Sequence, residues 1–311
     1  MPSLPTGVHP ILYALFDAEG ELDREAMRQQ VEICVGQGAA GITTLGLATE
    51  VRALTAEQRR RVVEWNAEDV AGRVPLGVTI FAPTPQEQLK AVDHAAAAGA
   101  DWVILQAPAS AADEHTLADD FSQVLVRCAL PAAVQNMPQF LGVGLSVAAI
   151  GRLADRHANL VAVKQEVSAT ETAELVASVG SRLRVFSGRG GLELVDCIRA
   201  GVTGHIPAPE YAEALVEVWR LMAAGEEAAA RDLYARYLPL ATFILQSLDS
   251  LTVYGKLLFC LRHGLPFHPR PGSARPTPFG VRSLRAHAAY LGIDTTGWDR
   301  ALGDLGERAS A

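Results

Sequence analysis

Hydrophobic and polar positions follow two alternating patterns from the N-terminus to about residue 225. Stretches with apolar residues at helical spacing end at a glycine or a polar turn, and a short, mostly apolar run lies between consecutive stretches. The eight apolar runs read GVHPILYALF, GITTLG, PLGVTIF, WVILQAP, PAAVQNMP, LVAVKQEV, LRVFSGRG and GHIPAP. Strict alternation of strands and helices is typical of a parallel sheet, and eight such units predict an α/β protein with a closed (β/α)8 TIM barrel.

Signals at the ends of the predicted helices agree with this alternation. Thr55 and Ser146 are expected N-caps, and Gln58 completes a capping-box pattern with Thr55. An open doubly wound sheet would alternate in the same way, but it usually carries a glycine-rich fingerprint after its first strand, which this sequence lacks. Glycines stand where helices should stop, at Gly38, Gly99, Gly180 and Gly201.

The pattern changes beyond residue 225, because no further strand candidate occurs. Residues 225–264 have helical spacing with a break expected near Pro239, and a turn rich in proline and glycine leads to a last helix, VRSLRAHAAYLG. We therefore predict a barrel over residues 1–225 that carries the active site, and a C-terminal helical region over residues 226–311.

The C-terminal helices carry more apolar surface than a helix lying on a barrel exterior can easily hide. We therefore expect part of this surface to lie at a subunit contact in a homo-oligomer, either a dimer or a tetramer. The apolar residues at helical spacing are Leu233, Tyr237, Leu240, Phe243, Ile244, Val253, Leu257, Leu258 and Leu261.

Composition and charge narrow the class of protein. Hydrophobic residues make up 49% and charged residues 20% of the chain, as in globular proteins. The net charge of −8 argues against a nucleic-acid partner, because phosphates require a basic face. No apolar stretch reaches membrane-spanning length, and the N-terminus lacks the basic and apolar regions of a signal peptide. We expect a cytoplasmic protein without a membrane partner.

Cysteine and histidine give no indication of a metal site. Neither residue type occurs at metal-ligand spacing, since CxxC, HxxxH and HExxH are all absent. We therefore expect no metal and no cofactor. The four cysteines are interpreted as small buried apolar residues: Cys34, Cys128, Cys197 and Cys260.

A lysine interrupts one of the apolar strands. Lys164 lies in LVAVKQEV, and the chain has only two other lysines, Lys90 and Lys256. A buried ammonium is unfavourable unless it is paired, and burial favours the free amine that attacks carbonyl groups to form a Schiff base. The alternative is a lysine that reaches solvent at the strand end or pairs with Glu166. We interpret Lys164 as a catalytic nucleophile, because a buried lysine on a strand is rare unless it has a function.

Alternation along the strands predicts which neighbours share the barrel interior with Lys164. Glu166 should point inward beside Lys164, while Gln165 should point to the helices. Glu166 then either shuttles protons for the amine or neutralises the arginine of FSGRGG at the rim. On the last strand, Ile206 should face the substrate and His205 should face outward.

Two loops are candidates for substrate binding. The loop after the second strand supplies Thr49, Glu50 and backbone N–H groups that could hold a carboxylate, unless it is a plain connection into the next helix. After the seventh strand, Ser187 and Gly188 leave room for a ligand, and Arg189 offers a fork of donors to a carboxylate.

Taken together, these segments resemble the dihydrodipicolinate synthase and N-acetylneuraminate lyase family of class I aldolase-type lyases. The matching segments are GVHPILYALFDAEGELD, LGLATEVRALTAEQRR, VQNMPQFLG, AVKQEVS and FSGRGG. The resemblance covers the barrel and continues into the helical tail. It implies a (β/α)8 barrel with a three-helix extension, usually a homotetramer, and a Schiff-base lysine that matches Lys164.

The chain departs from this family at several site positions. Leu47 and Ala48 stand where those enzymes carry a threonine pair, so the hydroxyls that bind the pyruvyl carboxylate are absent. Gln135 stands at the position of the proton-relay tyrosine, and an amide cannot exchange a proton as a phenol does. Phe140 matches the substrate-binding arginine of the synthase. The reactions of the synthase and of the sialic-acid lyase are therefore poor matches.

We predict a Schiff-base-forming lyase of the aldolase, dehydratase or deaminase type that acts on a small 2-oxo acid. Lys164 would attack the carbonyl, Gln135 would orient an intermediate, and Glu166 or a water would carry protons. A dehydratase of a 2-keto-3-deoxy sugar acid, or a deaminase of a cyclic imine acid, fits the lost tyrosine better than the synthase does. The alternative is a non-catalytic binding or regulatory protein on the same barrel.

Overall fold

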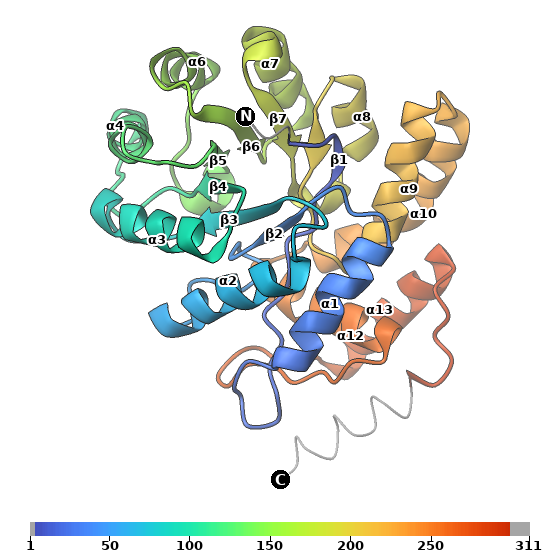
Figure 1. Cartoon of the computed structure of the whole chain (residues 1–311). Helices are drawn as coiled ribbons and strands as arrows, with labels where there is room; N and C mark the ends of the chain where they lie inside the picture. Colours follow the sequence, from blue (N-terminus) through green and yellow to red (C-terminus); the bar gives the residue numbers. More distant parts are fainter. Residues whose placement is uncertain (1–3, 299–311) are drawn as a thin grey trace.

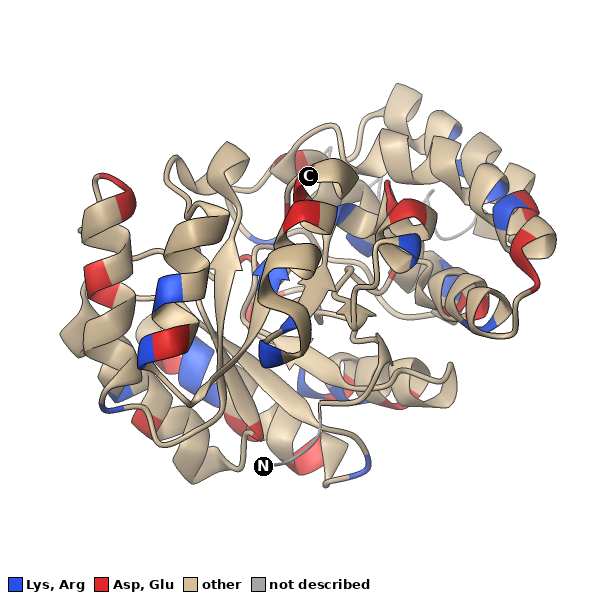
Figure 2. Cartoon of the chain, turned by 90° about the horizontal axis from the view of Figure 1, so that it is seen from above, with Lys and Arg blue, Asp and Glu red and all other residues tan. Residues whose placement is uncertain are grey.

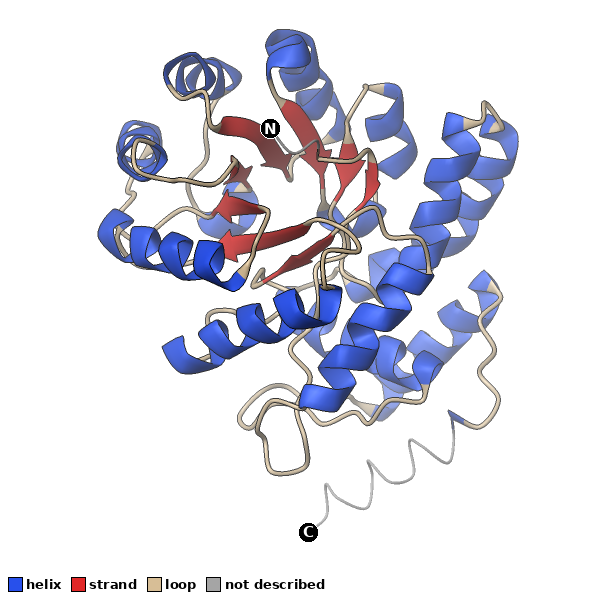
Figure 3. Cartoon of the chain, in the orientation of Figure 1, coloured by secondary structure: helices blue, strands red, loops and turns tan. Residues whose placement is uncertain are grey.

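Eight parallel strands form the centre of the structure, and helices surround them (Figures 1 and 3). The computed structural model describes residues 4–298. Neighbouring strands pair in the order β1-β8-β7-β6-β5-β4-β3-β2. The strands are β1 Gly7–Val8, β2 Ile42–Thr44, β3 Leu76–Ile80, β4 Trp102–Leu105, β5 Ala132–Asn136, β6 Leu160–Gln165, β7 Arg184–Ser187 and β8 Gly204–His205.

The sheet closes between its first two strands through a single parallel bridge, from Ile11 to Thr43. Leu12 N donates to Thr43 O at 2.9 Å, and Thr43 N donates to Pro10 O at 2.9 Å. The predicted (β/α)8 TIM barrel is therefore confirmed. The first strand is shorter than its apolar run, because Pro10 has no N–H to give to a ladder.

Two of the helices that cover the sheet begin at the predicted caps. Gln58 N donates to Thr55 Oγ1 at 3.1 Å, Thr55 N donates to Gln58 Oε1 at 3.0 Å, and Ser146 caps its helix through Ala149 N. A short helix that the pattern did not predict begins at Pro138. The helices are α1 Arg24–Gly36, α2 Ala56–Val70, α3 Pro85–Ala98, α4 Glu114–Leu125, α5 Pro138–Leu141, α6 Val147–Arg156, α7 Ala169–Val179, α8 Leu194–Arg199 and α9 Ala212–Ala223.

A cluster of buried rings fills part of the barrel interior. Trp102, the first residue of β4, stacks on Phe186 with ring centroids 5.6 Å apart, and His9 packs edge-on against both rings. Glycine is required opposite them, because a Cβ on Gly77 or Gly204 would lie 2.6 or 2.5 Å from the Trp102 and Phe186 rings. These rings therefore fill part of the barrel interior.

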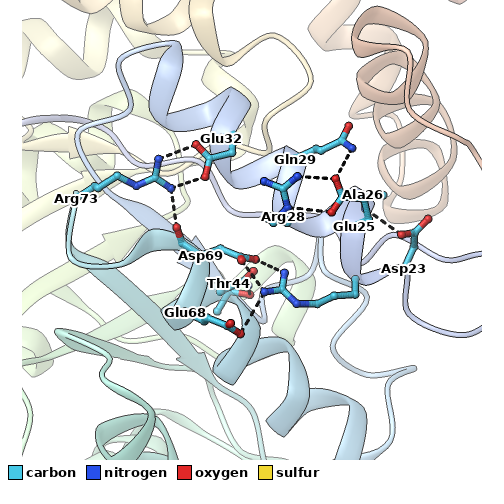
Figure 4. Close-up of polar contacts among 12 residues, drawn as sticks. Asp23, Glu25, Ala26, Arg28, Gln29, Glu32, Thr44, Glu68, Asp69 and Arg73 are labelled. Atoms are coloured by element: carbon cyan, nitrogen blue, oxygen red, sulfur yellow. Dashed lines mark hydrogen bonds and ion pairs between the residues drawn. The ribbon is translucent and has the colours of Figure 1, made fainter.

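Ion pairs connect the first two helices of the barrel (Figure 4). Arg24 on α1 pairs with Asp69 on α2 at 2.5 Å, and Arg73 after α2 pairs with Glu32 on α1 at 2.7 Å. Asn66 on α2 also donates to Thr44 Oγ1 on β2 at 2.8 Å. Elsewhere on the helices, acidic and basic residues are interspersed (Figure 2).

The C-terminal helices pack together at one side of the barrel, with α10 between α9 and α13 (Figure 1). They comprise α10 Glu227–Ile244, α11 Leu248–Ser250, a π turn over Leu251–Gly255, α12 Lys256–His263 and α13 Pro278–Leu291. The predicted division at residue 225 falls in the turn between α9 and α10, and the predicted second region continues past the described residues. Its existence as a separate unit stays a prediction.

The break predicted near Pro239 is wrong, because α10 continues through this proline to Ile244. The chain turns instead at residues 245–247, where Ser247 Oγ caps the next helix by accepting from Ser250 N at 3.0 Å. Between residues 4 and 298, no single helix is long and apolar enough to cross a membrane. Within the same residues, one pair of helices is long and apolar enough when the two are taken together: Glu227–Ile244 and Leu248–His263. The pair is bent by 111° at the break between the two helices.

The apolar faces of these helices are largely covered by the chain itself. Most of the residues that suggested a subunit contact are buried within the chain: Tyr237, Leu240, Ile244, Val253, Leu257 and Leu258. Their apolar character therefore does not require a second subunit. The dimer or tetramer stays a prediction.

A buried ion cluster attaches the C-terminal helices to the barrel. Lys256, only 2% exposed at the start of α12, donates to Glu50 in the loop after β2, and Arg270 Nε reaches the other oxygen of Glu50 at 3.3 Å. The Lys256 ammonium also lies 5.1 Å from the centre of the Phe16 ring. Glu50 thus has two cationic partners from the C-terminal region.

Removing the ammonium should leave the buried Glu50 carboxylate without its nearest partner. We expect Lys256→Met to lower the free energy of unfolding by about 3–5 kcal/mol in urea denaturation. The control is Lys90→Met, which removes an exposed lysine on α3 and should change stability by less than about 0.5 kcal/mol. Equal stability of the two variants would show that the cluster does not anchor the helices.

Candidate active site

A cavity of about 250 Å³ lies at the carboxyl ends of the strands. Gln135 on β5, Lys164 on β6 and Glu166 just after β6 form its polar wall. Leu47 and Ala48 from the loop after β2 and Ile206 from the end of β8 contribute apolar surface. Arg189, from the turn after β7, also lines the cavity. This is the end of the barrel at which substrates bind in enzymes of this fold.

Lys164 is buried in this cavity, with 4% of its surface exposed. Its backbone pairs with Gln135 on β5 and Phe186 on β7, so the side chain points into the barrel as the alternation predicted. The Nζ atom lies 3.4 Å from Glu166 Oε2. A primary amine in a small cavity beside a carboxylate has the arrangement that imine formation requires.

A chain of side-chain amides fixes the position of Glu166. Gln106 Nε2 donates to Gln135 Oε1 at 2.9 Å, which leaves the Gln135 amide nitrogen to donate to Glu166 Oε2. Glu166 is thereby held beside Lys164. Glu166 pairs with Lys164, and Arg189 pairs with Glu193 at 3.0 Å, so the predicted neutralisation of Arg189 by Glu166 is not observed within residues 4–298. The predicted proton-shuttle role of Glu166 stays a prediction.

Ser187 and Gly188, which were predicted to leave room for a ligand, make other contacts instead. A Cβ on Gly188 would lie 2.4 Å from Glu166 Oε1, so glycine leaves room for this carboxylate. Ser187 points outward, where its hydroxyl is hydrogen-bonded to His205 Nδ1 at 2.9 Å. Burial, with a smaller contribution from the Lys164 charge, lowers the pKa of His205 to about 3. The neutral, outward-facing imidazole agrees with the prediction for His205, and Ser187 does not line the cavity.

The turn after β7 holds Arg189 in an unusual backbone conformation. Its φ of 58° lies in the left-handed region, which costs a non-glycine residue about 1–3 kcal/mol. Three tyrosine hydroxyls secure the turn by donating to consecutive carbonyls, those of Gly190, Gly191 and Leu192. The donors are Tyr211, Tyr237 and Tyr234 in that order. Arg189 is therefore fixed at the cavity, where it can meet an anionic group.

The loop after β2 contributes only part of what was predicted. Leu47 and Ala48 line the cavity, but Thr49 and Glu50 do not. The Thr49 hydroxyl donates to Leu12 O at 2.6 Å, and the Glu50 carboxylate pairs with Lys256. Both polar groups are therefore engaged in holding the loop, and neither is free to bind a substrate.

Sequence reasoning missed a second carboxyl group in the cavity. Glu210, in the turn between β8 and α9, is 0% exposed, and its Oε2 accepts from the Tyr13 hydroxyl at 2.7 Å. Burial raises the pKa of Glu210 to about 7, and the hydrogen bond from Tyr13 opposes this rise. Its position in the connection between β8 and α9, at the carboxyl end of the barrel, was the available signal.

The segment between α10 and α12 also reaches the cavity, through Leu245, Ser247, Leu248 and Leu251. Within residues 4–298, no group of three or more histidine, cysteine, aspartate or glutamate side chains could hold a metal ion. All four cysteines are buried and unpaired with one another.

This chain is similar in sequence and in fold to proteins of a known enzyme family. The family model of the "Dihydrodipicolinate synthetase family" matches residues 4–259. The probable 2-dehydro-3-deoxy-D-pentonate aldolase YjhH of Escherichia coli K12 is 28% identical over 225 residues, which cover 69% of this chain and 74% of YjhH. A 4-hydroxy-tetrahydrodipicolinate synthase of Methanothrix thermoacetophila is 28% identical over 239 residues, which cover 75% of this chain and 80% of the synthase.

A solved structure shares the fold over nearly the whole chain. YagE of E. coli K12, a prophage protein of the dihydrodipicolinic acid synthase family crystallised with pyruvate, superposes with a TM-score of 0.84 at 21% identity, covering 94% of this chain and all of YagE. The family model matches well over half of the sequence. The chain therefore belongs to the dihydrodipicolinate synthetase family, whose members are lyases of the class I aldolase type.

Proposed function

We propose that this protein cleaves 2-keto-3-deoxy sugar acids through a Schiff base on Lys164. The observation that carries the proposal is the buried Lys164 amine, 3.4 Å from Glu166 in a cavity open to a small substrate. Two further points support the substrate class. YjhH is named as an aldolase of a 2-dehydro-3-deoxy sugar acid, and the YagE structure contains pyruvate, the 2-oxo acid that cleavage of such a compound releases.

The residues of the cavity have distinct roles in this reaction. The Lys164 amine attacks the C2 carbonyl, and Glu166 exchanges the protons that convert the resulting carbinolamine into an iminium and water. Gln135 holds Glu166 in place through its amide nitrogen. The C4 hydroxyl then loses its proton, the C3–C4 bond breaks, and C4 leaves as the carbonyl carbon of an aldehyde. The electron pair of the broken bond becomes the C2–C3 double bond of an enamine, and the iminium nitrogen becomes neutral. Protonation at C3 and hydrolysis release pyruvate and the free lysine.

The same cavity explains why we do not propose the synthase reaction. Gln135 is engaged with Glu166 and Gln106, and an amide cannot relay a proton as a phenol does. Leu47 and Ala48 present apolar side chains to the cavity in place of hydroxyls. We assign the positive charge that meets the substrate to Arg189, although Glu193 shares this arginine.

The rival function is non-catalytic binding of a small molecule in the same cavity. It would use Lys164 as a charged or covalent anchor without cleavage of a carbon–carbon bond. Ligand binding without turnover of any 2-oxo acid would favour this rival. The acid–base groups around Lys164 favour the enzyme instead, since simple binding has no need for a proton-exchanging partner.

We also propose a homo-oligomer, a dimer or a tetramer, in solution. Two large side chains of α13 support this, since Phe279 and Tyr290 are 69% and 62% exposed. Sedimentation equilibrium should give a mass that is a multiple of the 33.1 kDa chain. A single species at the mass of one chain would reject the assembly.

Borohydride reduction should trap the imine. In the presence of pyruvate, we expect a stable added mass on Lys164 and on no other lysine, read by peptide mass spectrometry. Lys164→Arg keeps the positive charge but cannot form the imine, so trapping should vanish while the circular dichroism spectrum persists. The matched control, Lys90→Arg, should trap as the wild type does. Labelling at Lys90 or Lys256, or at no lysine with any 2-oxo acid, would reject the proposal.

Dihydrodipicolinate synthase activity should be absent. With pyruvate and aspartate semialdehyde as substrates, we expect no appreciable turnover, because Leu47, Ala48, Gln135 and Phe140 replace groups that this chemistry uses. Each missing group should lower the rate by about 10²-fold or more. A coupled assay that gave a turnover of about 1–10³ s⁻¹ would contradict this account of the substitutions.

A further inference from the structure

A second acid–base group, Glu210, lies in the cavity apart from Lys164 and Glu166. It belongs to the turn that follows β8, and Ile206, Pro207 and Ala208 from the same turn line the cavity with it. The Glu210 side chain is completely buried, and its Oε1 atom has no hydrogen-bond partner within the described part of the chain. An oxygen without a partner, on the buried carboxyl group of a residue that lines a cavity, indicates a missing polar partner.

The surroundings hold this carboxyl group without neutralising it. Arg262 on α12 donates to the backbone carbonyl of Glu210 at 2.6 Å, while its other donors pair with Glu213. The Tyr13 hydroxyl donates to Glu210 Oε2 at 2.7 Å. Gly255 leaves space for this hydroxyl, because a Cβ there would lie 2.4 Å from it. Glu210 therefore has a fixed position, and its carboxyl group has no direct cationic partner among residues 4–298.

This environment allows Glu210 to change its protonation state near neutral pH. The titratable and charged groups that face it are Tyr13 before α1, Cys34 on α1, Tyr211 and Glu213 at α9, and Arg262 on α12. Burial raises the pKa values of Tyr13, Cys34 and Tyr211, so these three stay protonated. Burial also raises the pKa of Glu210, to about 7, where both of its forms are populated.

Cleavage of a 2-keto-3-deoxy sugar acid requires a base for the C4 hydroxyl. Gln135 cannot supply it, and Glu166 is occupied with the Lys164 amine. We propose that the Glu210 carboxylate takes the C4 hydroxyl proton of the imine-bound substrate, and that Tyr13 positions it for this step. This inference rests on the proposed function and assigns the proton transfer of its cleavage step.

In the cleavage direction, Glu210 Oε1 gains the proton, the C4–O bond becomes the carbonyl of the released aldehyde, and the C3–C4 bond breaks. The electron pair of that bond forms the enamine, which neutralises the iminium nitrogen. Condensation is the reverse, with protonated Glu210 donating to the aldehyde oxygen as the new bond forms.

The test compares variants in the cleavage of 2-dehydro-3-deoxy-D-gluconate and 2-dehydro-3-deoxy-D-pentonate. Because the carboxylate is the active form, the wild-type kcat should rise with pH through about 7. Glu210→Gln should lower kcat by about 10²–10⁴-fold and remove this rise. Tyr13→Phe removes a hydrogen bond that favours the carboxylate, so the rise should move to higher pH. Glu217→Gln, on the exposed side of α9, should match the wild type.

Borohydride trapping of pyruvate separates this inference from the proposed function. Trapping at Lys164 does not involve a C4 hydroxyl, so Glu210→Gln should trap pyruvate as the wild type does. A Glu210→Gln variant with wild-type turnover, or with an unchanged pH profile, would overturn the role of Glu210. A wild type that traps pyruvate but cleaves neither sugar acid would overturn the proposed cleavage and, with it, the role of Glu210. A wild type that does not trap pyruvate would instead overturn the proposed function.

Discussion

A lysine amine buried at the end of a barrel strand is the constraint on which the rest of the site depends. Such an amine requires a nearby carboxylate, and Glu166 supplies it at 3.4 Å. Glu166 in turn depends on Gln135 for a hydrogen bond and on Gly188 for space. Because β5, β6 and β7 are in parallel register, all three groups reach the same end of the barrel. Gln135 thus serves here to hold a carboxylate.

The C-terminal helices complete this site instead of only covering it. Lys256 engages Glu50 and so fixes the loop that presents Leu47 and Ala48 to the cavity. Tyrosines of α10 secure the turn that carries Arg189, whose backbone conformation would otherwise be unfavourable. Gly255, in the π turn before α12, accommodates the Tyr13 hydroxyl that contacts Glu210. Helices outside the barrel therefore determine where several groups of the cavity lie.

Local patterns predicted the barrel, the burial of Lys164, the inward Glu166 and the outward His205, because each follows from the period of a strand or helix. Local patterns failed where the role of a residue depends on a partner far away in the sequence. Glu50 seemed free to bind substrate, but its partner Lys256 lies 206 positions further along the chain. Glu210 was missed because its hydrogen-bond partner, Tyr13, is 197 positions away. No periodicity in the sequence connects residues so far apart.

The central claim is that Lys164 forms a covalent imine with a 2-oxo acid in the cavity beside Glu166. A crystal structure of the protein soaked with pyruvate tests this claim most directly. The account predicts continuous density from Lys164 Nζ to C2 of pyruvate, with Glu166 still hydrogen-bonded to Gln135. Pyruvate bound elsewhere, or bound in the cavity without a bond to Lys164, would contradict it.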